Sequence, residues 1–438
     1  MRHAFFGSLF LCLTTTFLSP QSSPAPLVNQ TARVAAPITT SQPSLVPVQL
    51  AELTADLNNL DSSVLGTSIA TNGNTVVAGA PGTYYGGGGV VFLYVEPSGG
   101  WANMTQPTLL YTSYGNHLGA SVAISSDGNT VVVGSPESGV DRQGGVFVFV
   151  KPQGGWPSEM VATASLQASD GTGNANLGTS VSFSGSAILA GAPGTSVGTN
   201  PNQGAAYLFV KPKTGWQGME ETAKITASDG MGGDRFGSAV RLSGGTAVIG
   251  AVDAPFTGPG KAYVFVKPSK GWKYMNQVAE LTSSDGEVGD NFGASVSISG
   301  SAILVGAPNA TNGSGSTEGA AYVFVKPQTG WVNETETAKL TASDEAADDF
   351  FGTSVFLAGS VAAVGSPKTF GSNEQGAAYL YVKPGKGWST TQTFTTKLTA
   401  SDGEPGDNFG YSLALVGKTV MSGAPQATGG GAAYVFGR

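Results

Sequence analysis

The chain has 438 residues and a formal net charge of −8 at pH 7, from 29 acidic and 21 basic side chains. Apolar residues make up 40% of it, enough to bury a core and to exclude wholesale disorder, and its 65 glycines favour short strands joined by tight turns. Because the chain is acidic and has no Lys/Arg clusters, we expect it to bind neither nucleic acid nor an anionic membrane.

The first 25 residues have the pattern of a secretory signal peptide. A basic start at Arg2 is followed by an apolar run from Ala4 to about Leu18 and then by small polar residues. The alternative is an uncleaved membrane anchor, but the run is shorter than the roughly 20 residues that a bilayer requires. We therefore expect export to the periplasm, the cell surface or the medium, with no membrane span in the mature chain. Cys12, the only cysteine, lies in this segment, so the mature chain would contain no disulfide.

Residues 26–48 are rich in Ser, Thr, Pro and Ala without periodicity, which predicts a flexible linker. From residue 49 to residue 438 one unit recurs seven times with a period of about 55 residues, which predicts one supersecondary unit per copy. A Gly-Ala-Pro or Gly-Ser-Pro motif, a variable loop and an apolar run such as Ala-Tyr-Val-Phe recur in order, except that the fourth copy has Val252 in place of the proline. Each copy begins with a glycine that follows Leu or Phe, at Gly66, Gly119, Gly178, Gly237, Gly293, Gly352 and Gly410.

Each unit contains four strand-like runs, which in the fifth copy are residues 292–299, 302–308, 320–327 and 337–343. The turns between the runs are short and rich in glycine, and no segment has a helical period. The sequence therefore predicts an all-β protein, a seven-bladed β-propeller of four-stranded antiparallel blades.

The two ends of the repeat region complement each other. The last copy lacks a fourth run, whereas an isolated fourth-run sequence from Gln49 to Asp56 precedes the first copy. An unpaired edge strand is unfavourable, and a ring removes its edges only when its ends join. We expect Leu50–Ala55 to pair with the seventh blade as its outer strand.

The motif residues have packing interpretations. The glycine after Phe or Leu is expected at the entry of the innermost strand, where the absence of a Cβ permits close approach of backbones near the axis. The preceding Phe or Leu is interpreted as a wedge between neighbouring blades. Each of the six tryptophans follows a turn glycine, and we expect it to cover the edge of its blade; stacking on a sugar is the alternative.

These units, with Phe-Gly-x-Ser-Val, Gly-Ala-Pro and Ala-Tyr-Val-Phe, resemble the FG-GAP repeats of integrin α-chain propellers and, more closely, secreted bacterial proteins built from such repeats. The resemblance covers residues 49–438 and implies a propeller, a scaffold that carries many activities. The integrin pattern also includes calcium loops of the form Asp-x-Asp-x-Asp-Gly between the first two strands. Here that turn is as short as Ser-Gly-Ser-Ala, so those calcium sites are not expected.

A pair of aspartates precedes the Phe-Gly motif in four copies. Two carboxylates across a glycine-containing turn are candidate ligands for calcium, although calcium takes roughly six to eight oxygens and the pair does not supply them alone. The alternative, which we favour, is that each aspartate accepts hydrogen bonds from backbone N–H groups and orders the loop. The pairs are Asp229/Asp234, Asp285/Asp290, Asp344/Asp349 and Asp402/Asp407.

Signatures of catalysis are missing from the sequence. The chain beyond the signal segment has one histidine, His117, which we interpret as a surface residue, and no cysteine. The inner strands carry small and hydroxyl side chains with Arg241 as their only charge, so no acid/base pair is predicted in the channel. We therefore expect no enzymatic activity.

The loops that follow Gly-Ala-Pro differ in length and chemistry, and strand parity places them on the same face as the aspartate loops. Loops on one face of a rigid scaffold are a common place for recognition. The alternative is that the sequences of these loops vary only because nothing constrains them. We expect a monomer that binds a protein or a cell-surface or matrix ligand there, with a carbohydrate-binding module or a polysaccharide-degrading enzyme as alternatives. The candidate ligand-binding residues are Tyr84, Tyr85, Asp141, Arg142, Asp253, Phe256, Lys368 and Phe370.

Overall fold

The computed structural model describes residues 47–55, 64–82, 88–113, 116–253, 258–311, 317–368 and 374–437. The chain divides into Met1–Ser44 and Leu45–Arg438, and every described residue belongs to the second part. The predicted signal peptide, and the predicted linker up to residue 46, lie outside the described residues. No helix in the described ranges is long and apolar enough to cross a membrane.

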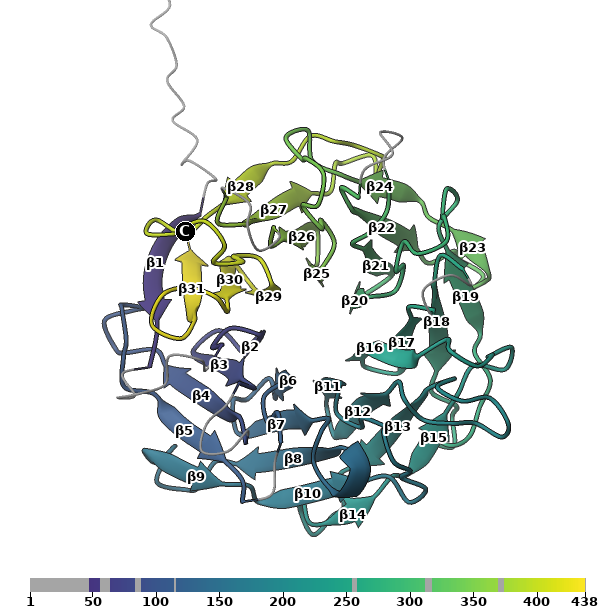
Figure 1. The fold of residues 1–438 in the computed structure, drawn as a ribbon, viewed down its shortest axis with the longest axis horizontal. Coiled ribbons are helices and arrows are strands. Elements are labelled where there is room, and N and C mark those ends of the chain that lie inside the picture. Colours follow the sequence, from purple (N-terminus) through teal and green to yellow (C-terminus); the bar gives the residue numbers. More distant parts are fainter. Residues whose placement is uncertain are drawn as a thin grey trace, which may run out of the picture. The chain divides into compact units, whose positions relative to one another are not determined.

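Leu45–Arg438 folds into seven β-sheets arranged as blades around one axis, as the sequence predicts (Figure 1). From the axis outwards, blade 1 consists of β2 (Ser68–Thr71), β3 (Thr75–Ala80), β4 (Val90–Val95), β5 (Thr108–Tyr111) and β9 (Glu159–Val161). Blade 2 consists of β6 (Ser121–Ile124), β7 (Thr130–Ser135), β8 (Gly145–Val150), β10 (Ala164–Gln167) and β14 (Met219–Glu220). Blade 3 consists of β11 (Ser180–Ser184), β12 (Ala187–Ala192), β13 (Ala205–Val210) and β15 (Ala223–Ile225).

The remaining blades follow the same order around the ring. Blade 4 consists of β16 (Phe236–Ser243), β17 (Thr246–Ala251), β18 (Lys261–Val266), β19 (Ala279–Thr282) and β23 (Glu334–Thr335). Blade 5 consists of β20 (Ser295–Ser299), β21 (Ala302–Ala307), β22 (Ala320–Val325) and β24 (Ala338–Leu340). Blade 6 consists of β25 (Ser354–Ala358), β26 (Val361–Ser366), β27 (Ala377–Val382) and β28 (Thr396–Leu398). Blade 7 consists of β29 (Ser412–Val416), β30 (Thr419–Ala424), β31 (Ala432–Gly437) and β1 (Val48–Leu53).

The first strand closes the ring, which confirms the prediction for Leu50–Ala55. β1 runs antiparallel to β31 with Glu52 opposite Tyr434 and Leu53 opposite Ala433, and Figure 1 shows the purple strand beside the yellow one. Ala51 and Leu53 point into the core. The outer strand of the last blade is therefore supplied from the start of the propeller.

Three blades contain a fifth strand that the sequence did not predict. β9, β14 and β23 each belong to the third-to-fourth connection of one blade and pair parallel with the outer strand of the preceding blade. Single parallel bridges at Leu53–Met104 and Leu340–Thr391 occupy the same place. These contacts cover an otherwise unpaired edge, and their two or three residues are too few to show alternation in the sequence.

The wedge interpretation of the motif aromatics is confirmed. Phe292 is fully buried and packs edge-on against Tyr322 and Phe324 of its own blade, with ring centroids 5.4 and 6.0 Å apart. The same cluster contains Val264 of the preceding blade. Four tryptophans are also buried in such clusters, which is the packing role predicted for them: Trp216, Trp272, Trp331 and Trp388.

Backbones of neighbouring blades touch near the axis. A Cβ on Gly306 would collide with the carbonyl oxygen of Gly352 in the next blade, and one on Gly352, whose φ is +97°, would approach the Ala320 carbonyl oxygen. The predicted reason for the glycine after Phe, close approach of backbones, is therefore confirmed, and Gly306 is constrained in the same way, which the sequence did not predict.

A serine two residues after each motif glycine joins the blades. In blade 7 the Ser412 hydroxyl donates to the Gly66 carbonyl oxygen of blade 1 at 2.6 Å. Equivalent bonds of 2.7–2.8 Å exist at five other interfaces, and only blade 4 has an alanine, Ala239, at this position. The sequence shows the recurrent serine but not its partner.

Candidate functional site

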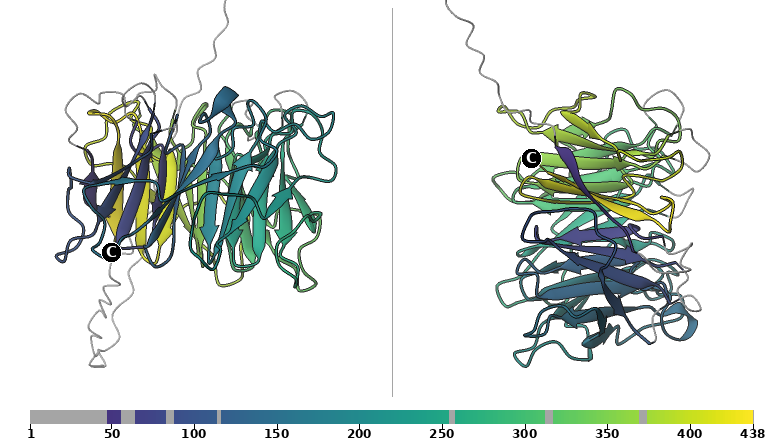
Figure 2. Two further views of the ribbon diagram at one scale, coloured as in Figure 1. Left: turned by 90° about the horizontal axis from the view of Figure 1, so that it is seen from below. Right: turned by 90° about the vertical axis from the view of Figure 1, so that its left-hand side faces the viewer.

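We call the face that carries the second-to-third and fourth-to-first connections the variable-loop face. In Figure 2 the strands run between this face and the opposite one, and the short blue helix η1 (Val140–Arg142) stands out from the ring. The aspartate pairs, the described candidate ligand-binding residues and η1 all belong to connections on the variable-loop face.

The first aspartate of each pair bridges two strands of the blade that follows it. Asp285 comes after the outer strand of blade 4, and its carboxylate accepts hydrogen bonds from the Tyr322 hydroxyl at 3.0 Å and the Lys339 ammonium at 2.6 Å in blade 5. Burial raises the pKa of Asp285, but the hydrogen bond and charge of Lys339 outweigh burial, so this pKa lies below its ordinary value. The contact anchors the loop between the two blades.

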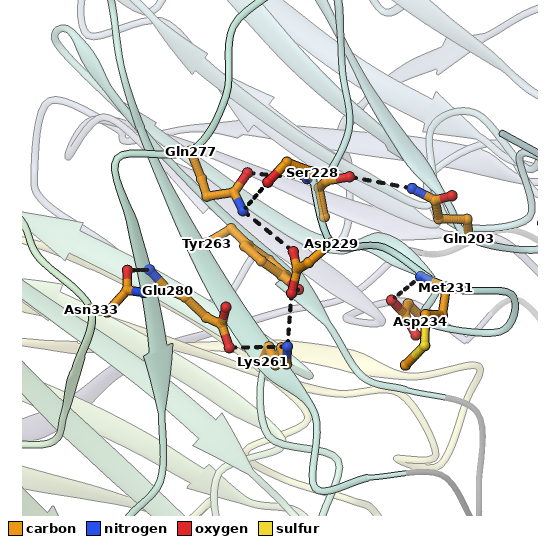
Figure 3. Close-up of polar contacts among 11 residues, drawn as sticks. Gln203, Ser228, Asp229, Met231, Asp234, Lys261, Tyr263, Gln277, Glu280 and Asn333 are labelled. Carbon is orange, nitrogen blue, oxygen red and sulfur yellow. Dashed lines mark hydrogen bonds and ion pairs between the residues drawn. The ribbon is translucent and has the colours of Figure 1, made fainter.

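The same arrangement recurs around the ring. Asp170 pairs with Tyr207 and Lys224, and Asp344 pairs with Lys397. In blade 4 the lysine comes from the third strand, β18, instead of the fourth. The Lys261 ammonium pairs with Asp229 at 2.9 Å and with Glu280 at 3.0 Å. Figure 3 shows both contacts.

Blade 2, whose preceding loop has no aspartate in its sequence, also lacks the partners. It has Phe147 at the tyrosine position and Ser165 at the lysine position. Because aspartate, tyrosine and lysine are absent together there, the first aspartate belongs to a structural unit.

The closing blade departs from this unit in one residue. Glu52 of β1 lies opposite Tyr434, at the position where blades 3, 5 and 6 have the lysine. Burial and, secondly, the neighbouring Asp402 carboxylate raise the pKa of Glu52. Two carboxylates therefore meet at the place where the ring closes.

The second aspartate of each pair orders the turn that precedes the wedge. The N–H of Glu287 donates to the Asp290 carboxylate at 2.9 Å, and Asp234, Asp349 and Asp407 each accept the corresponding N–H at 2.7 Å. Burial, as the largest cause, raises the pKa of Asp234, Asp290 and Asp407 above the ordinary value.

The two carboxylates of a pair thus have separate partners. Figure 3 shows Asp229 held by Lys261 and Gln277, while Asp234 accepts the Met231 N–H. In the part of the chain that the structure describes, no three His, Cys, Asp or Glu side chains gather to hold a metal ion. These contacts support the loop-ordering alternative, and the calcium hypothesis stays a prediction.

Half of the candidate ligand-binding residues can be placed. Tyr84, Tyr85, Phe256 and Phe370 lie outside the described residues.

Lys368, one of the candidate ligand-binding residues, is buried. Only 4% of the residue is accessible, and its ammonium group pairs with Asp349 at 2.6 Å and Glu374 at 3.2 Å. The buried Asp349 carboxylate draws the lysine inward, so Lys368 stabilises the loops and is not an available contact. Asp253, in the fourth copy, is partly exposed and has a φ of +61°.

Asp141 and Arg142 lie in η1 at the edge of the variable-loop face. Both adopt left-handed backbone, with φ of +53° and +58°, and their carbonyl oxygens accept the N–H groups of Asn174 and Asn176 in the next blade. The Arg142 side chain is 60% exposed and lies 3.7 Å from Glu137, which also contacts His117 at 3.4 Å. His117 is 47% exposed, as its interpretation as a surface residue requires.

A ring of left-handed residues was missed by the sequence reasoning. The residue immediately before each Leu-Gly or Phe-Gly has a φ between +51° and +61° in all seven copies. Asparagine tolerates this conformation, whereas a β-branched or bulky residue is strained in it. The ring consists of Val64, His117, Asn176, Arg235, Asn291, Phe350 and Asn408.

Two members of this ring line a hollow of about 380 Å³ on the variable-loop face. Asn176 and Arg235 face it together with Asn174, Asn202 and other loop residues of blades 3 and 4. Arg235 is exposed and forms no ion pair with any described residue. Val252, which replaces the motif proline, also lines the hollow. The hollow offers amide groups and one guanidinium, and it contains no pair of groups suited to acid/base catalysis.

The comparisons agree with this architecture. A family model described as FG-GAP repeat matches residues 160–209, 219–265, 275–324, 335–381 and 392–436, which together exceed half of the chain. Each matched segment begins near the outer strand of one blade and ends with the third strand of the next, so it spans an aspartate loop. Among curated proteins, none matches the chain.

Proposed function

Because the chain belongs to the FG-GAP repeat family and folds as a seven-bladed propeller, we propose that it is a secreted, non-catalytic binding protein. Its variable-loop face recognises a protein, or a component of a cell surface or matrix, that presents an acidic group. The hollow between blades 3 and 4, with Arg235 at its side, is the centre of that surface.

The unpaired, exposed Arg235 carries this proposal. Its φ of +52° is the left-handed conformation that this position adopts in all seven copies, so the repeat fixes the backbone from which the guanidinium extends. This conformation persists because the Arg235 N–H donates to Asn202 and the Ser238 hydroxyl donates to the Arg235 carbonyl. A rigid, planar donor in a hollow is suited to bidentate contact with a carboxylate.

The positive charge of Arg235 and the uncharged amides around it favour an acidic partner at this point. Three asparagines add amide donors around the guanidinium, and amides bind carboxylate or carbonyl oxygens without a change of protonation. No histidine or carboxylate is among the described residues that line the hollow, and the groups present there, amides and a guanidinium, are suited to holding a ligand.

The proposal is tested with purified protein on an array of matrix proteins, peptides and glycans. Saturable binding to an acidic partner should weaken at least tenfold in Arg235→Ala, since a charge-assisted hydrogen bond contributes roughly 1.5–3 kcal/mol. Lys270→Ala, an exposed cation of the same blade on the opposite face, removes the same charge and should bind as the wild type.

Two results would count against the proposal. Equal binding by Arg235→Ala and Lys270→Ala would remove the hollow from the recognition surface. Turnover of any arrayed polysaccharide would reject the non-catalytic assignment, and glycan binding indifferent to Arg235 would favour a carbohydrate-binding module on another part of the ring.

A further inference from the structure

Arg241 occupies the central channel of the propeller. It lies on β16, the inner strand of blade 4, and lines a cavity of about 110 Å³ together with residues of five other inner strands. The small residues Ala70, Ala123, Ser182 and Ala414 line this cavity with Phe356, whereas Ile69, Val122 and Leu242 of the same strands are buried in the cores between blades. Arg241 is partly exposed, and no carboxylate is among the described residues that line the cavity.

The guanidinium of Arg241 has no counter-ion among the described residues. The Arg241 side chain makes no hydrogen bond or ion pair within the described ranges, and its guanidinium carbon lies 4.4 Å from the centre of the Phe356 ring in a cation–π contact. Burial lowers the pKa of Arg241 to about 10, so the side chain is still a cation at neutral pH. The channel therefore holds an uncompensated positive charge inside an acidic protein.

Packing alone does not require an arginine at this position of the inner strand, four residues after the motif glycine. The equivalent residue is small in five copies, namely Ala70, Ala123, Ser182, Ser297 and Ala414. Only blades 4 and 6 carry large side chains there, and these two, Arg241 and Phe356, contact each other across the channel. The aromatic ring holds the guanidinium in place, as cation–π contacts do.

We propose that the channel is a binding site for a short-chain carboxylate, with Arg241 as its anchor. A carboxylate matches one guanidinium in charge and in planar, two-pronged geometry, and a short hydrocarbon tail fits beside the alanines that line the cavity, Ala70, Ala123 and Ala414. The cavity is too small for a large ligand. A phosphate dianion would leave one charge without a partner among the residues that line the cavity.

The site has an approach from the face opposite the variable loops. A second hollow of about 440 Å³ shares Thr71, Ile124 and Phe183 with the channel cavity. It is lined by first-to-second-strand turns and carries Lys211 and Asp127, whose opposite charges offset each other. A small anion therefore reaches Arg241 without crossing the surface proposed to bind a partner.

Calorimetric titration of the full chain with sodium propionate tests the proposal, with sodium chloride balancing the ionic strength. Wild-type protein should give saturable heat, and Arg241→Met, which keeps the length of the side chain, should lose it by tenfold or more. Phe356→Leu should weaken propionate about two- to fivefold by releasing the guanidinium. Arg235→Met is the matched control, because it loses the same charge on the variable-loop face, and it should bind propionate as the wild type does.

Several outcomes would overturn the site. They are the absence of saturable heat in the wild type, unchanged affinity in Arg241→Met, or an equal response to chloride alone. The wild-type titration decides even if a channel variant does not fold, and circular dichroism of each variant identifies that case. Loss of partner binding in Arg235→Ala would leave propionate binding intact, so the two sites are tested separately.

Discussion

Closure of the ring by β1 can be tested by shortening one side chain on the buried face of this strand. Leu53 is fully buried and belongs to the core shared by blades 7 and 1, beside Val435 and Phe92. Leu53→Ala removes apolar contacts and leaves a cavity, which at such sites costs about 3 kcal/mol in the free energy of unfolding. Urea denaturation followed by tryptophan fluorescence measures the loss, since buried tryptophans recur around the ring.

Leu50 provides the matched control on the same strand. It is 42% exposed, so Leu50→Ala makes the identical chemical change where little burial is lost, and its cost should stay below about 1 kcal/mol. Equal destabilisation by the two variants would mean that β1 does not pack against blades 7 and 1. The urea dependence of the unfolding free energy should be unchanged in both, because the surface exposed on unfolding is nearly the same.

Three other expectations concern single positions. Burial raises the pKa of Glu345 to about 9 from 4.5 in the unfolded chain, so the folded state loses stability as pH rises between these two values. Glu345→Gln should therefore match the wild type at pH 4.5 and be about 2–4 kcal/mol more stable at pH 8, as measured by thermal and urea denaturation. A difference in stability that does not change with pH would contradict this. Glu52→Lys should raise the melting temperature, more at low salt, by pairing with Asp402 as lysines do in other blades; no gain would mean that the closing blade cannot adopt that contact. Gly306→Ala should destabilise by more than about 2 kcal/mol, because its Cβ meets the Gly352 carbonyl, whereas alanine at exposed Gly99, with open space around it, should be tolerated.

The fold was predictable because every copy repeats the same in-phase signals. Glycine before the inner strand and proline after the second strand recur at fixed distances, and an isolated outer-strand sequence precedes the first copy. The fifth strands were not predictable, because β14 and β23 have two residues each and pair with another blade. A periodicity of two needs a longer segment than that to be visible.

The site residues were harder to predict than the strands. Strand parity identifies the face on which a loop lies, but it does not give the direction of a side chain, and Lys368 turned inward to Asp349. The aspartate–tyrosine–lysine unit joins residues of neighbouring copies, for example Asp285 to Lys339. Its signal is present in the sequence as the joint absence of the three residues at blade 2, which becomes meaningful once the contact is known.

In a repeat protein, the other copies show what packing alone requires at each position. The fourth copy departs from them in three motif positions: Ala239 replaces the serine that joins blades, Arg241 replaces a small residue, and Val252 replaces the motif proline. Arg241 lines the channel cavity and Val252 lines the hollow with Arg235. Independent drift would scatter such departures among copies and would leave them unrelated to cavities. Their concentration in blade 4, beside two cations without ion pairs among the described residues, is what the two proposed binding sites predict.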